Sequence, residues 1–206
     1  FAFPSRYTLD MKGLSKADAA RVAGNQFLDV NEEPREIELS VGAVVVATGW
    51  KPYDVTRLSN LGAGAVKNCI TNMQLERLAA PSGPTGGRIV RPTDGRRPHH
   101  VAFVQCAGSR DQNYCSYICC MATLKHCQYL AEQSPETQIT VYYIDLRAPG
   151  RYVKVLEKVK AMPNVHFVKG KVADAVQAEG DKVRLTAEDA VSGEKLTLDY
   201  DLVVLA

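Results

Sequence analysis

Two short runs of apolar residues stand out along the chain, one near residue 45 and one at its end. The first covers residues 43–47 (AVVVA) and is followed by Thr48 and Gly49, and the second covers residues 201–206 (DLVVLA). A short apolar run of this kind is typical of a strand that is buried on both faces of a sheet. Residues 37–41 (IELSV) alternate apolar and polar positions, which predicts an edge strand before the first run.

A new pattern begins after Pro98. We expect a strand over residues 100–105, a loop, a helix over residues 116–133 and a strand over residues 138–146. A strand, a crossover helix and a second strand form a βαβ unit, in which the strands are parallel and the crossover is right-handed. A helix over residues 152–161 continues the pattern, which predicts an α/β fold with a Rossmann-like part in residues 98–206.

Shorter segments complete the predicted elements. Ser15 has the character of an N-cap, so residues 16–22 are expected to form a helix. The other expected elements are a helix over residues 72–78 and strands near residues 166–168, 182–186 and 195–198. The similar apolar runs at 43–47 and 201–206 suggest two related α/β units. The chain begins without Met or a signal sequence and ends inside a predicted strand, so we expect an internal piece of a longer protein.

Composition and charge exclude several classes of function. The 206 residues are 46% hydrophobic and 23% charged with a formal net charge of +2, and basic residues form no long run. A nucleic-acid-binding surface therefore has no electrostatic support. No apolar run approaches the roughly 20 residues that a membrane crossing needs, so we expect no direct membrane span. The sequence also lacks a Gly-x-Ser-x-Gly motif, which leaves hydrolase chemistry without support.

Four of the six cysteines cluster in the spacing Cys106-x8-Cys115-x3-Cys119-Cys120. Four thiolates are the ligand set of a [4Fe–4S] cluster, so these residues are candidate metal ligands. Zinc also accepts four thiolates, although its structural sites favour Cys pairs separated by two to four residues. Buried cysteines that only pack on a helix face are the third possibility. The pattern alone leaves all three open.

Two further features relate to nucleotide binding. The glycine-rich fingerprint G-x-G-x-x-G is missing after the strand that ends near Cys106. Asp145 stands at the end of the next predicted strand, where an acid binds ribose in dinucleotide-binding folds, but a loop-capping Asp explains it equally well. The tripeptide Ala47-Thr48-Gly49 ends the first apolar run, where small residues let the backbone approach a cofactor closely.

These residues carry a family resemblance. The chain resembles the flavin-containing A subunit of heterodisulfide reductase and, in our interpretation more closely, the A subunit of the quinone-interacting membrane-bound oxidoreductase complex of sulfur-metabolising bacteria. The segments that carry it are Phe3-Pro4, Arg6-Tyr7, 44–54 (VVVATGWKPYD), 70–85 (ITNMQLERLAAPSGPT), 101–111 (VAFVQCAGSRD), 114–125 (YCSYICCMATLK) and 142–152 (YYIDLRAPGRY).

The resemblance implies a two-dinucleotide-binding-domain flavoprotein, similar in architecture to thioredoxin reductase. Residues 1–97 would form a partial FAD-binding domain with a connector, and residues 98–206 the Rossmann-like second domain. Ala47, Thr48 and Gly49 would belong to the FAD site. The four clustered cysteines, Cys106, Cys115, Cys119 and Cys120, would hold a [4Fe–4S] cluster. The pyrophosphate fingerprint of the family lies upstream of the residues present here.

Three hypotheses for function follow. The first is a cytoplasmic electron-transfer protein, associated with the membrane through a partner, that relays electrons between membrane quinol and adenylylsulfate reductase. Its partners in the complex would be a membrane cytochrome subunit together with a second subunit that carries flavin and iron-sulfur groups. The second is a soluble heterodisulfide-reductase-like subunit that takes electrons from a hydrogenase or dehydrogenase. The third is a degenerate α/β interaction module with structural cysteines.

Overall fold

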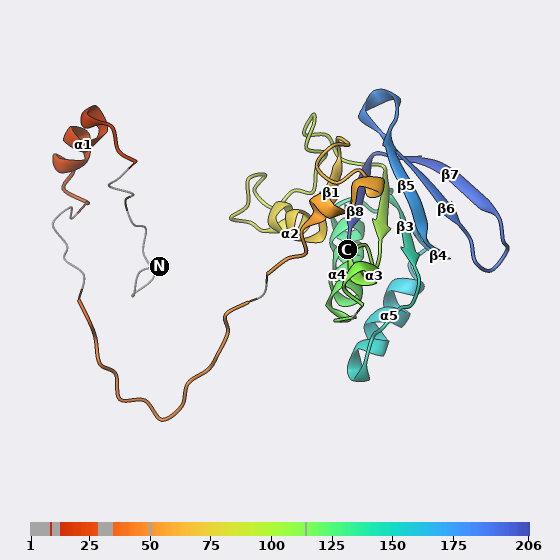
Figure 1. Cartoon of the computed structure of the whole chain (residues 1–206), viewed down its shortest axis with the longest axis horizontal. Coiled ribbons are helices and arrows are strands. Elements are labelled where there is room, and N and C mark those ends of the chain that lie inside the picture. The colour runs from red at the N-terminus through yellow and green to blue at the C-terminus, as the bar shows by residue number, and fades with distance from the viewer. Residues whose placement is uncertain (1–8, 10–12, 29–34, 50, 114) are drawn as a thin grey trace. The chain divides into compact units, whose positions relative to one another are not determined.

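The computed structural model describes residue 9 and residues 13–28, 35–49, 51–113 and 115–206. The chain divides into two compact units, residues 1–50 and residues 51–206. In the first, helix α1 (Lys16–Ala23) begins as predicted at Ser15, whose hydroxyl accepts a hydrogen bond from the Asp18 backbone N–H. Figure 1 labels the elements of both units. The predicted boundary at residue 97, between an FAD-binding domain and a Rossmann-like domain, stays a prediction.

The strands predicted over residues 37–41 and 43–47 are wrong for this structure, because residues 35–49 contain no strand. Val44, Val45 and Val46 expose 79%, 89% and 77% of their surface. A strand is stabilised by ladder hydrogen bonds and by side chains packed on its faces. The described part of the first unit supplies no neighbouring strand, so these valines have nothing to pair with.

The second unit is built on a five-stranded sheet in the order β1-β8-β2-β3-β4, with all pairs parallel. Its strands are β1 (Cys69–Thr71), β2 (His100–Val104), β3 (Gln138–Tyr143), β4 (Val165–Lys169) and β8 (Leu202–Leu205). Strand β8 lies between β1 and β2 and is fully buried, as its apolar sequence predicts. The predicted α/β fold class with a parallel βαβ unit is therefore confirmed.

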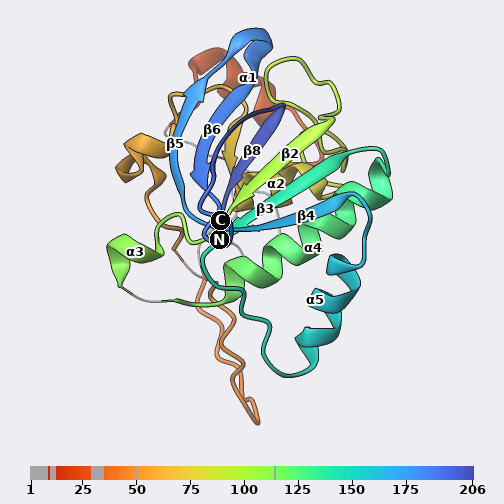
Figure 2. The same ribbon diagram turned by 90° about the vertical axis from the view of Figure 1, so that its right-hand side faces the viewer.

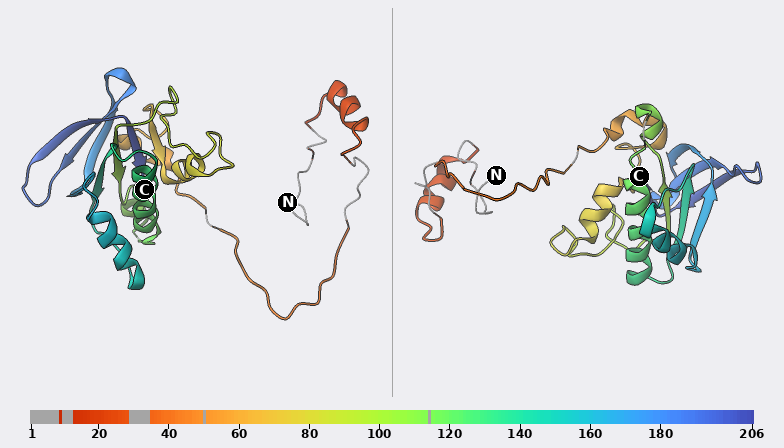
Figure 3. Two further views of the ribbon diagram at one scale, coloured as in Figure 1. Left: turned by 180° about the vertical axis from the view of Figure 1, so that it is seen from behind. Right: turned by 90° about the horizontal axis from the view of Figure 1, so that it is seen from below.

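Helices cover one face of this sheet (Figures 2 and 3). They are α2 (Asn72–Ala79), α4 (Ile118–Gln133) and α5 (Val153–Lys160), and each packs against a neighbour. Thr71 starts α2 with a capping box, in which its hydroxyl accepts the Gln74 N–H and the Gln74 side chain accepts the Thr71 N–H. The core on this face includes Leu75, Phe103 and Leu124.

A second, antiparallel sheet covers the other face and has the order β5-β6-β7. Its strands are β5 (Val172–Gln177), β6 (Val183–Glu188) and β7 (Lys195–Tyr200). Tyr142 of β3 and Tyr200 of β7 join the two sheets through a buried hydrogen bond of 2.8 Å between their hydroxyls. The shorter elements are η1 (Val55–Arg57), η2 (Ser59–Leu61), α3 (Ser109–Gln112), η3 (Gly150–Tyr152) and η4 (Glu179–Asp181).

Candidate metal centre at the cysteine edge

The four clustered cysteines lie at the carboxyl edge of the parallel sheet, on the connection from β2 to α4. Gln105 extends β2, since its N–H donates to the Tyr142 carbonyl (3.0 Å), and Cys106 follows it. The chain then turns away from the strand, because Cys106 has a left-handed φ of 60°. Ligand sites in α/β sheets form at this carboxyl edge.

The backbone of this connection is irregular. Asn113 and Tyr117 adopt left-handed φ values of 55° and 52°. Tyr117 therefore cannot continue the helix backwards, and α4 begins at Ile118 rather than at the predicted residue 116. Gly108 packs against the Tyr53 ring, where a Cβ atom would meet ring carbons at 2.7 to 2.9 Å. Only glycine fits at this position, and the contact between Gly108 and Tyr53 holds the start of the loop.

The thiols differ in exposure and in acidity. Cys115 is exposed, Cys106 and Cys119 are half-buried, and Cys120 is buried. The Cys119 thiol donates a hydrogen bond that lowers the pKa of Cys120 to about 6, and the Arg147 backbone N–H also favours that thiolate. The same hydrogen bond and burial raise the pKa of Cys119, and the charges of Cys106 and Cys115 add to the rise. The four sulfur atoms thus interact, and the hydrogen bond from Cys119 favours the thiolate form of Cys120.

The loop after β3 forms the opposite side of this edge. The Cys120 sulfur lies 3.8 Å from the Asp145 carbonyl oxygen. The Asp145 carboxylate pairs with the Arg147 guanidinium at 2.9 Å, and both side chains are exposed. This ion pair supports a loop-stabilising role for Asp145 over ribose binding. The other two cysteines stand apart, and burial raises the pKa of both Cys69 and Cys127 to about 12.

The described residues fit a thiolate-bound metal group in their chemistry. Thiolates are the forms that bind metals, and the loop offers four sulfur donors in one neighbourhood. The amide of Gln105, which precedes Cys106, is buried without a hydrogen-bond partner among the described residues, as expected where a further group belongs. Within the same residues, no three His, Cys, Asp or Glu side chains are already arranged to hold a metal ion. Binding therefore requires the loop to close around its ligand.

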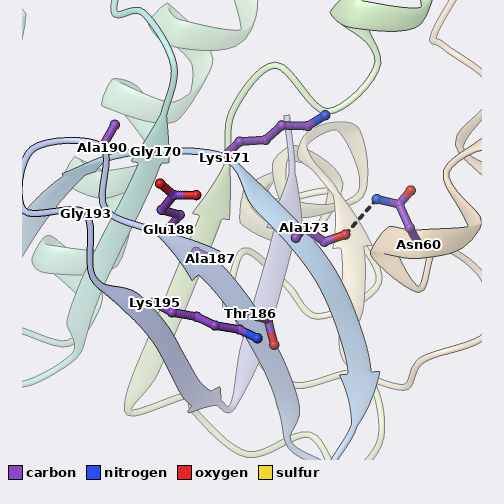
Figure 4. Close-up of a pocket in the computed structure, with 10 residues that line it drawn as sticks. All are labelled: Asn60, Gly170, Lys171, Ala173, Thr186, Ala187, Glu188, Ala190, Gly193 and Lys195. Atoms are coloured by element: carbon purple, nitrogen blue, oxygen red, sulfur yellow. Dashed lines mark hydrogen bonds between the residues drawn. The ribbon is translucent and has the colours of Figure 1, made fainter.

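The other predicted site residues are Ala47, Thr48 and Gly49. Ala47, Thr48 and Gly49 belong to the first unit and lie in irregular, exposed backbone. A role for them in FAD binding stays a prediction. A cavity of about 800 Å³ opens beside β6 and β7 (Figure 4), where Glu188 and Lys195 face it and Asn60 donates to the Ala173 carbonyl. The residues lining it include no cysteine or histidine, and no sequence pattern predicted it.

Sequence reasoning also missed Gln105 and Tyr53, which shape the cysteine edge. A polar residue that closes an apolar strand directly before a cysteine is the signal that identifies Gln105. Tyr53 had no such signal, because its contact with Gly108 joins segments that lie 55 positions apart in the sequence.

Comparison with curated proteins gives relatives that are A subunits of heterodisulfide reductases. The chain is 42% identical over 185 residues to an iron-sulfur A subunit (number 2) of the CoB--CoM heterodisulfide reductase of Methanopyrus kandleri, an alignment that covers 87% of the chain and 28% of that protein. It is 36% identical over 212 residues to the corresponding iron-sulfur protein of Methanocaldococcus jannaschii, covering all of the chain and 32% of the relative. The chain's homologues are the A subunits of heterodisulfide reductases.

The chain therefore spans less than a third of the length of these relatives. No model of a protein family matches it. Among solved structures, thioredoxin reductase from T. acidophilum aligns with a TM-score of 0.39 at 13% identity, covering 68% of the chain and 35% of that structure. The enzyme from Giardia duodenalis gives a TM-score of 0.39 at 12% identity, with the same coverage of each chain. None of the helices in the described part of the chain has the length and apolar character needed to cross a membrane.

Proposed function

We propose that the chain is part of the electron-transferring A subunit of a heterodisulfide-reductase-type complex. The observation that carries this proposal is the group of four interacting cysteines at the carboxyl edge, in a chain 42% identical to a protein named as an iron-sulfur subunit. Cys106, Cys115, Cys119 and Cys120 would ligate a [4Fe–4S] cluster, which exchanges single electrons when bound. Ala47, Thr48 and Gly49 would contribute to an FAD site.

The relatives favour the second hypothesis over the first. The protein of Methanothermobacter marburgensis, 38% identical, is named as part of a H(2):CoB-CoM heterodisulfide,ferredoxin reductase. That of Methanosarcina acetivorans, 41% identical, is named as dependent on ferredoxin and F(420)H(2). These names support a partner that supplies electrons from a hydrogenase or a dehydrogenase. They give no support to a role with membrane quinol and adenylylsulfate reductase.

The chain's own residues would perform three tasks. The hydrogen bond from Cys119 lowers the pKa of Cys120 and so favours the thiolate form that binds metals. The left-handed turn at Cys106 directs the chain away from β2, so that the first sulfur lies at the same edge as the sulfurs of α4. Helix α3 and the Gly108 contact with Tyr53 lie at the start of the loop, and the exposed Cys115 further along it would move inward.

The domain arrangement is part of the same proposal. Residues 1–97 would supply part of an FAD-binding domain and its connector, and residues 98–206 the cluster-bearing Rossmann-like domain. The exposed valines 44–46 support an incomplete first domain, because an apolar run of this kind needs the remainder of a sheet to bury it.

Iron and acid-labile sulfide analysis of the anaerobically purified full-length protein tests the proposal. Flavin content and EPR spectra after dithionite reduction are recorded on the same sample. We expect Cys119→Ser and Cys120→Ser each to lose about four irons relative to the wild-type protein, as one thiolate-ligated cube predicts. The matched control is Cys69→Ser, which should keep the wild-type iron content because Cys69 lies away from the cysteine edge.

Three results would contradict the proposal. Equal iron content in the wild type and both serine variants would exclude a cluster at these residues. Zinc in place of iron, or intact complex assembly and electron flux in both variants, would favour the interaction module with structural cysteines.

A further inference from the structure

Two buried polar side chains beside the cysteine edge have no hydrogen-bond partner among the described residues. Gln105 is 4% exposed, and both its amide nitrogen and its amide oxygen lack a partner. Thr123 is 1% exposed, and its hydroxyl lacks one too. A buried polar group without a hydrogen-bond partner is unfavourable, so a native structure retains such a pair only for a reason.

The strand geometry shows on which face of the sheet Gln105 lies. Its N–H continues the ladder to Tyr142, so side chains still alternate at this position. Gln105 therefore shares a face with Phe103, two residues earlier. The Phe103 ring stacks on the ring of His126, with centroids 6.2 Å apart, so this is the face that α4 covers.

The helix geometry then places Thr123 and Cys119 along the same line. They precede His126 by three and seven residues, so all three lie on one stripe of α4. Helix α4 runs back from the carboxyl edge, while β2 runs toward it. With His126 over Phe103, the preceding turn with Thr123 lies over Gln105, and Cys119 comes next toward the edge.

We infer that Gln105 is a positioning residue for the metal group proposed above, on which this inference rests. Its amide Nε2–H donates a hydrogen bond to a sulfur of the bound cluster, on the side of Cys106 and Cys119. On binding, the amide turns until its oxygen accepts a hydrogen bond from the Thr123 hydroxyl, a bond that neither group makes in the structure. The cluster then satisfies the amide nitrogen directly, and the Thr123 hydroxyl and the amide oxygen satisfy each other.

This contact has a measurable consequence. Reduction adds negative charge to a cluster, and a hydrogen bond to its sulfur stabilises that charge. Removing the donor therefore shifts the reduction potential to a more negative value while leaving the four thiolates in place. A residue that only fills space at this position would leave the potential unchanged.

The test is an EPR-monitored redox titration of the anaerobic full-length protein. The signal of this cluster is identified as the one that disappears in Cys119→Ser. Gln105→Leu keeps the volume and removes the donor, and we expect it to retain wild-type iron and to show a more negative potential. Thr123→Val should shift the potential in the same direction by less, and Thr123→Ser, which keeps the hydroxyl, should match the wild type.

A second readout covers the case in which Gln105→Leu fails to load iron. Electron–nuclear double resonance on the reduced wild-type protein, with 15N in the glutamine side chains and in H₂O against D₂O, should show an exchangeable proton and a nitrogen coupled to this cluster. Absence of that coupling overturns the inference, as does a wild-type potential in Gln105→Leu. Absence of any signal lost in Cys119→Ser instead contradicts the proposed function itself.

Discussion

Asp201 connects the start of β8 to the start of β2, and removing its carboxylate should destabilise the second unit. Its side chain is 8% exposed, and one oxygen accepts the backbone N–H groups of both His99 and His100 at 2.9 Å. The other oxygen lies 3.7 Å from the Arg91 guanidinium and 3.7 Å from the Lys182 ammonium. The Asp201 carboxylate thus contacts the start of β2, Arg91 and Lys182, which lie in three separate segments of the chain.

The contacts give the size of the effect. Asp201→Ala loses two hydrogen bonds to a charged acceptor and leaves two N–H groups near the interior unpaired, so we expect a loss of about 3–5 kcal/mol in the free energy of unfolding. Asp201→Asn retains an oxygen for both N–H groups and removes only the charge, which predicts a smaller loss of about 1–2 kcal/mol. Urea unfolding followed by circular dichroism at pH 7 measures both.

The pH dependence of the free energy of unfolding shows how much of the effect of Asp201 comes from its charge. Burial acts to raise the pKa of Asp201, but the two N–H groups, Lys182 and Arg91 together outweigh it and lower the pKa below its usual value. A lowered folded-state pKa contributes stability above the unfolded-state value, and this contribution is lost as pH falls through the folded value. The gap between the wild type and Asp201→Asn should therefore narrow in acid. A constant gap, or a change below about 0.5 kcal/mol for Asp201→Ala at pH 7, would refute the reasoning.

Two further predictions concern packing. A Cβ atom at Gly170 would overlap the Glu188 carbonyl oxygen, so Gly170→Ala should displace the β6–β7 hairpin. We expect it to lower the free energy of unfolding by about 2 kcal/mol or more, measured by thermal unfolding. Gly42→Ala is the control and should be neutral, because open space surrounds Gly42. Tyr142→Phe should cost about 1–2 kcal/mol because it leaves the buried Tyr200 hydroxyl unpaired, and the double variant with Tyr200→Phe should cost less than the sum of the two single changes. Additive losses would show that the two hydroxyls act independently.

The sequence predicted the parts of the fold whose pattern is local. The βαβ unit around α4, the central strand β8 and helix α2 follow from apolar periodicity and caps within each segment. Strand β1 was missed, because its three residues become a strand only through pairing with β8, about 134 positions away. The strand predicted at residues 44–46 is the opposite error, a strand expected where the structure has none. An apolar run forms no strand when the described residues supply no neighbouring strand.

The candidate site likewise has residues that a local sequence pattern predicts and residues that it does not. Spacing alone singled out the four cysteines as candidate metal ligands, because metal ligands come from few residue types. It could not identify Gln105 or Thr123, whose significance lies in the absence of partners in three dimensions among the described residues. Nor could it identify the effect of Cys119 on the pKa of Cys120, which depends on a hydrogen bond between adjacent residues at the start of a helix.

Several unfavourable contributions to stability lie together at the cysteine edge. Cys106 and Tyr117 hold left-handed conformations without being glycine, and such residues cost on the order of 1–3 kcal/mol each. The unpaired amide of Gln105 adds a further cost at the same place. The remainder of β2 and α4 is well packed, with Val101, Phe103 and Cys127 fully buried, so the unfavourable contributions concentrate at the loop that carries the sulfurs. Metal binding couples to folding because it stabilises only the closed form of such a loop. Ligation at these four cysteines should therefore stabilise the whole sheet edge, and the loop without its ligand should be the first part of the second unit to open.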